Sequence, residues 1–119
     1  MLPEDRDAAY LWDILDVAKT VVEFTTGLSL HDYLKDRKLQ LAIEREIEII
    51  GEAARRLSEN FKAAHPEVPW SRIIAQRNVL AHEYGDIKQD RIFNLAKTHI
   101  PELIELLEPL LPPVPPEIE

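Results

Sequence analysis

The chain of 119 residues contains no cysteine and only three glycines. The absence of cysteine excludes disulfides, thiolate nucleophiles and cysteine metal sites, and it is typical of proteins in the reducing cytosol. No apolar run approaches the roughly 20 residues that are needed to cross a bilayer. The N-terminus carries Glu4 and Asp5 in place of the basic and apolar regions of a signal peptide. We therefore expect a soluble cytoplasmic protein without membrane association.

Basic charge is also scarce. Lys and Arg number 14 against 22 Asp and Glu, which gives a net charge of −8. This sign disfavours general nucleic-acid binding, because contacts with phosphate normally dominate affinity. We expect no DNA partner. Contact with RNA would have to be confined to a small local patch, or else the main partner is another protein.

What the sequence does contain is helical periodicity over the length of one domain. Apolar residues recur at helical spacing in four segments, and no segment alternates as a strand would. The predicted helices cover residues 3–25, 36–60, 70–84 and 88–107. Gly27 and Gly85 are expected to end the first and third of these helices. A short helical turn is expected in the connector 28–35, starting after Ser29 or His31.

These elements predict an all-α fold, an antiparallel up-and-down bundle of four main helices. Pro101 lies inside the fourth helix, so we expect a kink or a short break there. Gly51 lies inside the second helix, where glycine costs about 1 kcal/mol relative to alanine, and it is expected to mark the close approach of a neighbouring helix. The helical domain is predicted to cover 1–111, followed by an extended proline-rich tail over 112–119.

The segment Arg77-Asn78-Val79-Leu80-Ala81-His82-Glu83-Tyr84 concentrates polar chemistry at the end of the third helix. Arginine is always charged and histidine exchanges protons near neutral pH, which suits chemistry on a phosphodiester. Asn78 and His82 share one helix face, whereas Arg77 and His82 stand about 140° apart. A second subunit on a two-fold axis would bring two arginines and two histidines into one cleft. The alternative is a surface ion pair for Arg77, a helix-dipole contact for His82 and local packing of Tyr84.

Other kinds of site fit the sequence less well. The four histidines are scattered, and no two of them stand four residues apart as a helical zinc pair would. The glutamates of the second helix, including Glu52, have Lys or Arg neighbours and are interpreted as a solvated face. The serines lack the glycines of a nucleophile elbow, and there is no glycine-rich phosphate loop. We expect no metal and no cofactor.

Several short motifs follow one another in order over roughly residues 5 to 105. They are Asp5-Arg6-Asp7, Leu11…Asp13-Ile14, Ala42…Glu44-Arg45, Ile49-Ile50-Gly51-Glu52-Ala53-Ala54, Pro66…Val68-Pro69-Trp70 and Arg77-Asn78…Leu80-Ala81-His82…Tyr84. In order and spacing they resemble the HepT-like family of small HEPN-domain proteins, the toxin half of prokaryotic toxin–antitoxin pairs. The proline-rich tail lies outside the resemblance.

The resemblance implies a metal-independent ribonuclease that acts on RNA as a homodimer, with its active cleft at the subunit junction. By matching positions, Arg77 and His82 would be the catalytic pair and Asn78 would support them. The resemblance also implies a cognate MNT-type nucleotidyltransferase antitoxin, which attaches AMP to Tyr84 and silences the toxin. The alternative is a non-catalytic nucleotide-binding or interaction module that partners the nucleotidyltransferase.

Overall fold

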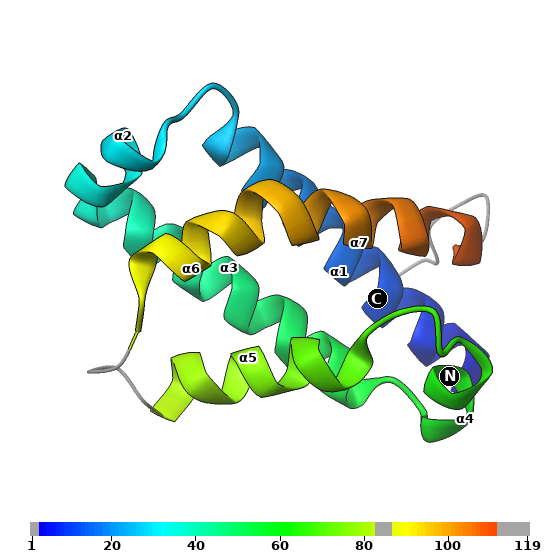
Figure 1. Ribbon diagram of the computed structural model, residues 1–119. Helices are drawn as coiled ribbons and strands as arrows, with labels where there is room; N and C mark the ends of the chain where they lie inside the picture. Colours follow the sequence, from blue (N-terminus) through cyan, green and yellow to red (C-terminus); the bar gives the residue numbers. More distant parts are fainter. Residues whose placement is uncertain (1–2, 83–86, 112–119) are drawn as a thin grey trace.

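The computed structural model describes residues 3–82 and 87–111, and within these ranges it contains helices and no strand (Figure 1). The main elements are α1 (Pro3–Thr25), α3 (Arg37–Arg56), α5 (Trp70–His82) and a segment that runs through α6 (Gln89–Asn94) into α7 (Ile100–Leu107). They lie against one another as an antiparallel bundle. The all-α architecture expected from the sequence is confirmed, and the proposed tail over 112–119 lies outside the described residues.

The first helix has the bounds that the sequence predicts. Gly27 follows it with φ of 76°, a left-handed conformation that glycine adopts without steric cost. Ser29 then caps α2 (Leu30–Lys35): its hydroxyl accepts a hydrogen bond from the Asp32 amide at 3.1 Å, and its own amide donates to the Asp32 carboxylate at 3.4 Å. This reciprocal capping box places the start of the short helix after Ser29 and not after His31.

The second predicted helix is too long at its C-terminal end. The helix stops at Arg56, Leu57 is extended with ψ of 148°, and Ser58 caps a separate helix, α4 (Glu59–Ala64). The buried carboxylate of Asp7 on α1 accepts hydrogen bonds from the Ser58 amide at 2.8 Å and the Ser58 hydroxyl at 2.7 Å. This contact across the fold holds the chain in the break. Helical periodicity does not show the break, because Leu57 is apolar and buried like the core-facing residues of α3.

The fourth helix is irregular next to its proline. A π-helical turn, η2 (Leu95–His99), separates α6 from α7, and the Ile100 amide donates to the Leu95 carbonyl five residues back. Pro101 has no amide proton, and its ring crowds the carbonyl four residues earlier, so regular α-helical bonding cannot continue through this turn. The irregularity expected near Pro101 is therefore confirmed. The segment ends in a 3-10 turn, η3 (Glu108–Leu110).

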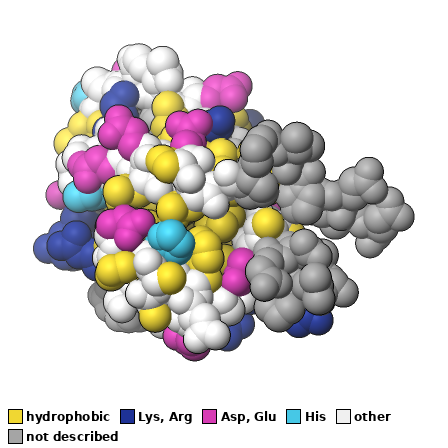
Figure 2. All heavy atoms as spheres, turned by 90° about the vertical axis from the view of Figure 1, so that its right-hand side faces the viewer, with side chains coloured by type: hydrophobic (Ala, Val, Ile, Leu, Met, Phe, Trp, Pro, Cys, Tyr) yellow, Lys and Arg dark blue, Asp and Glu magenta, His cyan; other side chains and the backbone are white. Residues whose placement is uncertain are grey.

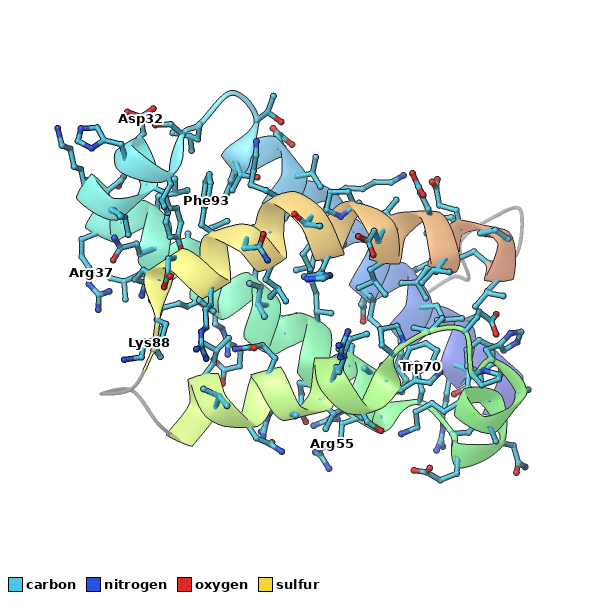
Figure 3. The ribbon with its side chains drawn as sticks, viewed as in Figure 1. Asp32, Arg37, Arg55, Trp70, Lys88 and Phe93 are labelled. Carbon is cyan, nitrogen blue, oxygen red and sulfur yellow. The ribbon has the colours of Figure 1, made fainter. Side chains whose placement is uncertain are left out.

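The core lies mainly between α1, α3 and α7. Its buried side chains are largely aliphatic and recur at helical spacing along these helices; they include Leu11, Ile14, Ala18, Ile43, Ile47, Ile50, Ile100, Leu103 and Leu107. At the α4 end, Trp70 is buried and its indole donates to the His65 carbonyl at 3.0 Å, which fixes the start of α5 (Figure 3). Within the described ranges, no helix is long and apolar enough to cross a membrane.

Helix α5 packs on α3 at Gly51. A β-carbon added to Gly51 would overlap the β-carbon of Arg77 and would lie 3.0 Å from the backbone carbonyl oxygen of Ile73. Only a residue without a side chain allows the two helices to come this close. The close approach expected from the sequence is confirmed, and the helix that makes it carries Arg77.

Replacement of Gly51 by alanine should therefore destabilise the protein. Helix propensity alone would favour alanine by about 1 kcal/mol, whereas overpacking at the contact should cost about 1–3 kcal/mol. Urea unfolding followed by circular dichroism measures the balance, with Arg45→Ala on an exposed position of the same helix as the control. A more stable Gly51→Ala protein would contradict the close packing of α3 and α5.

Candidate active site

Helix α5 brings together part of the predicted catalytic set. Arg77 is half-buried, Asn78 is exposed, and the Arg77 Nη1 donates to the Asn78 side-chain oxygen at 3.0 Å. His82 is the last residue of α5, five positions after Arg77 on the same helix. The side chain of His82 lies outside the described part of the structure, as do Tyr84 and the helix end expected at Gly85. The structure therefore places Arg77 with Asn78 and leaves the positions of His82 and Tyr84 side chains as predictions.

Arg77 forms an ion pair with Glu52 on α3. The Arg77 Nε lies 3.2 Å from a Glu52 carboxylate oxygen, and the Arg77 side chain is 24% exposed. This nitrogen is buried, and among the described residues no acceptor is aligned with its N–H. The contact is therefore an ion pair, in which charge attraction and burial hold the inner edge of the guanidinium. The surface ion pair considered for Arg77 is present, although it is more enclosed than the sequence suggested.

Glu52 binds two further arginines of its own helix. Arg55 donates to both carboxylate oxygens, from Nη2 at 2.8 Å and from Nε at 3.3 Å, and Arg56 donates from Nε at 3.1 Å. These hydrogen bonds, with the nearby charge of Arg77, lower the pKa of Glu52 to about 2. At neutral pH the carboxylate is therefore fully charged.

The interpretation of Glu52 as part of a solvated face was therefore incomplete, because this carboxylate links α3 to the candidate catalytic arginine. The sequence contained one indication of this role, because Glu52 directly follows Gly51, the glycine at which α5 packs closely on α3. A glutamate next to a point of close helix contact can reach the neighbouring helix.

Arg77 and Glu52 help to line a groove of about 450 Å³, whose other lining residues come from α1 and α3. Its lining carries both signs of charge, with Arg56 near Glu52 and with Asp13 and Asp16 on α1. Burial and the neighbouring Asp16 raise the pKa of the Asp13 carboxyl above its ordinary value. The groove is therefore acidic along α1 and basic near Arg77.

A larger groove of about 570 Å³ lies between α5 and α7 and does not include Arg77. Its lining includes the aliphatic side chains of Ile47 and Ile50. Figure 2 shows hydrophobic side chains in a hollow near the centre of one face of the molecule. Most of its lining is apolar, and the polar side chains that also line it, among them Arg72 and His99, lie outside the predicted catalytic set. We therefore centre the candidate active site on Arg77 and the smaller groove.

The described histidines do not converge with carboxylates on a metal position. His31 is exposed on α2, His99 is exposed on η2, and the His65 ring lies 3.2 Å from the Glu67 carboxylate near the end of α4. Among the residues that the structure describes, no group of three or more His, Asp or Glu could hold a metal ion. The chemistry that the described residues offer is that of a fixed guanidinium.

The link between Glu52 and the arginines should appear in the pH dependence of stability. The folded-state pKa of about 2 lies below the ordinary value of 4.5, so the charged carboxylate stabilises the folded state above about pH 4.5. This stabilisation is lost as the pH falls towards 2. We expect Glu52→Gln to unfold more easily than the wild type at pH 7, by a difference that shrinks on acidification in urea titrations.

The matched control is Glu48→Gln. Glu48 has nearly the same side-chain exposure (27% against 28%) and pairs with a single arginine, Arg45, at 3.4 Å. An exposed pair within one helix contributes little to stability, so this variant should behave like the wild type at all pH values. A Glu52→Gln deficit that is the same at pH 7 and pH 3 would show that charge is not its cause.

The family model described as "Ribonuclease HepT-like" matches residues 14–110, which include Glu52, Arg77 and His82. A "Putative RNase" of Methanocaldococcus jannaschii is 34% identical over 110 residues, or 92% of this chain and 91% of its own. A "Probable ribonuclease HepT" of Thermococcus cleftensis is 37% identical over 94 residues, which cover 79% of this chain and 86% of the relative. No solved structure gives a significant match. The chain belongs to the HepT-like ribonuclease family.

Proposed function

We propose that the protein is the toxin of a prokaryotic toxin–antitoxin pair and acts as a metal-independent endoribonuclease on RNA. The observation that carries this proposal is the position of Arg77, whose guanidinium is fixed by Glu52 on one helix and by Asn78 on its own helix. His82 follows on the same helix within the part of the chain that matches the ribonuclease family. A fixed cation beside a proton-transfer group is what cleavage of a phosphodiester without metal requires.

In the proposed reaction, one His82 imidazole accepts the proton of a ribose 2′-hydroxyl, whose oxygen attacks the adjacent phosphorus. The bond from phosphorus to the 5′-oxygen breaks, and a protonated imidazole supplies the proton to this leaving oxygen. The products are a 2′,3′-cyclic phosphate and a 5′-hydroxyl. Arg77 stabilises the additional negative charge on the phosphorane, and Asn78 helps to orient the guanidinium.

We propose further that the active cleft lies at the junction of a homodimer. Arg77 and His82 stand five positions apart in the sequence, which corresponds to about 140° around an ideal helix within a single subunit. A two-fold axis next to α5 would supply both groups from both copies. The groove beside Arg77 carries acidic side chains along α1 and basic ones near α5, and a surface with both signs can complement its own copy.

Replacement of Arg77 or His82 by alanine should reduce RNA cleavage by about 100-fold or more, since each removes a group that acts on the transition state. Helical content should not change, because alanine favours helix and keeps the β-carbon of Arg77 that contacts Gly51, and because His82 is the last residue of α5. Cleavage of a labelled single-stranded RNA, with and without EDTA, measures the effect, and EDTA should leave the wild-type rate unchanged.

His99→Ala, which alters an exposed histidine on η2, serves as the control and should cleave at the wild-type rate. The active protein should sediment as a dimer at micromolar concentration, and a monomer that cleaves RNA would contradict the shared cleft. A wild-type protein that binds the nucleotidyltransferase but never cleaves RNA would favour the non-catalytic interaction module instead.

We also propose that an MNT-type nucleotidyltransferase antitoxin neutralises the protein by attaching AMP to Tyr84. Tyr84 follows His82 by two positions, so a phosphate on its hydroxyl would place negative charge near Arg77 and compete with RNA for the guanidinium. Incubation with ATP and the cognate enzyme should add the mass of AMP to the wild type and should abolish RNA cleavage. Tyr84→Phe should block the modification.

Tyr10→Phe is the matched control for this modification, because Tyr10 is a partly buried tyrosine on α1 and should not affect labelling. If AMP attaches to Tyr84 but cleavage continues at the same rate, neutralisation of Arg77 is not the inhibitory mechanism. If an active transferase adds no mass, the antitoxin acts by binding alone.

A further inference from the structure

We propose that Arg55 and Arg56 form, together with Arg77, a binding site for the phosphate backbone of single-stranded RNA. This inference rests on the proposed ribonuclease function and specifies how the substrate is held. It concerns two residues that lie outside the predicted catalytic set. It also addresses the conflict between a net charge of −8 and a polyanionic substrate.

The evidence is an imbalance of charge at Glu52. At other ion pairs of the described residues one cation meets one carboxylate, as with Arg45 and Glu48 at 3.4 Å or Lys19 and Glu108 at 3.8 Å. At Glu52, three guanidinium groups approach a single carboxylate within 3.3 Å. The single negative charge of Glu52 offsets one of the three positive charges, so the cluster of Glu52 with its three arginines has a net charge of about +2 at neutral pH. The cluster is a local basic patch on an acidic protein.

The three arginines differ in exposure in a way that suits a bound strand. The side chains of Arg55 and Arg56 are 52% and 55% exposed, whereas that of Arg77 is 24% exposed. Figure 3 shows Arg55 projecting beside α5, away from α6 and α7. Arg77 is therefore the inner group of the cluster, and the other two form its outer edge. A strand whose scissile phosphate reaches Arg77 would bring neighbouring phosphates to Arg55 and Arg56.

The guanidinium chemistry favours phosphate as the ligand. Each group has five N–H donors in a planar fork that matches phosphate oxygens. Glu52 accepts from Nε of Arg56 and from Nε and Nη2 of Arg55, so each guanidinium carries further donors beyond these bonds. Glu52 thus sets the orientation of the cluster without using all of its donors.

Acidic side chains limit the path of the strand. Asp13 and Asp16 line the same groove as Arg56 and Arg77 but come from α1, and Glu48 is paired with Arg45. An RNA strand that crossed the groove towards α1 would meet Asp13 and Asp16, which form no ion pair with the residues that the structure describes. The arrangement therefore favours a strand that runs along the C-terminal end of α3 and the adjoining side of α5.

Salt dependence of RNA binding tests the proposal. For single strands, each phosphate contact contributes about 0.7 to the slope of log affinity against log salt concentration. The double variant Arg55→Gln with Arg56→Gln should reduce this slope by about 1.4, so that the loss of affinity between 50 and 200 mM salt becomes about sevenfold smaller. The probe is a 2′-O-methyl RNA oligonucleotide, which lacks the 2′-hydroxyl that cleavage requires and keeps binding separate from chemistry.

The matched control is Lys35→Gln with Lys38→Gln. These exposed lysines lie at the opposite end of α3 and at the adjoining end of α2, and their loss removes the same two positive charges. The control should retain the wild-type slope. If both double variants lower the slope equally, or if neither does, no phosphate site exists at Arg55 and Arg56, and the patch would then serve an acidic protein partner or none.

An assay of the cleavage of unmodified RNA by the wild type tests the proposed function separately from the binding site. If the wild type cleaves RNA and the arginine variant keeps the full slope, the binding site is wrong and the ribonuclease stands. If the wild type neither binds nor cleaves RNA, both proposals fall. Circular dichroism of both double variants should match the wild type, because the four replaced side chains are exposed.

Discussion

The close contact between α3 and α5 at Gly51 determines how the candidate site is built. The two helices approach until the backbone of one meets the β-carbon of a residue on the other, which only glycine permits. Helix α5 packs mainly on α3, so this contact sets its depth in the bundle. Arg77 lies at the point of contact, and its partial burial follows directly from this geometry.

The same contact explains why a single carboxylate has so large an electrostatic effect. Glu52 is next to Gly51 in the chain, so the approach of α5 brings Arg77 within 3.2 Å of a carboxylate that already binds Arg55 and Arg56. Three cations around one anion hold the pKa of that anion near 2. A deprotonated Glu52 keeps the guanidinium of Arg77 in one place. Fixed charge of this kind is what catalysis by electrostatic stabilisation needs, because no reorganisation is required during the reaction.

An acidic protein can act on RNA if its positive charge is concentrated where the substrate binds. The net charge of −8 is an average over the chain, whereas phosphate responds mainly to charges within about one Debye length, roughly 8–10 Å. The arginine cluster supplies such a local patch. The acidic remainder would lower the affinity for RNA that lies elsewhere on the surface, which would favour binding in one orientation.

The sequence by itself determined the features that depend on neighbouring residues along the chain. Helical periodicity predicted the bundle and the bounds of α1, Ser29 supplied one of two possible starts for α2, and Gly51 indicated a close helix contact. The motif from Arg77 to Tyr84 identified the end of α5 as the candidate site. Each of these signals is read within a few turns of one helix.

Only the tertiary structure decided the features that join distant parts of the chain. The break after Arg56 depends on Asp7, which binds Ser58 from 51 residues away. The role of Glu52 depends on α5 lying across α3. Gly51 beside it indicates a close helix contact, but not which helix makes the contact or which polar group of that helix reaches Glu52. These outcomes follow from packing between helices, and the spacing of apolar residues within one helix carries no information about which polar groups the packing brings together.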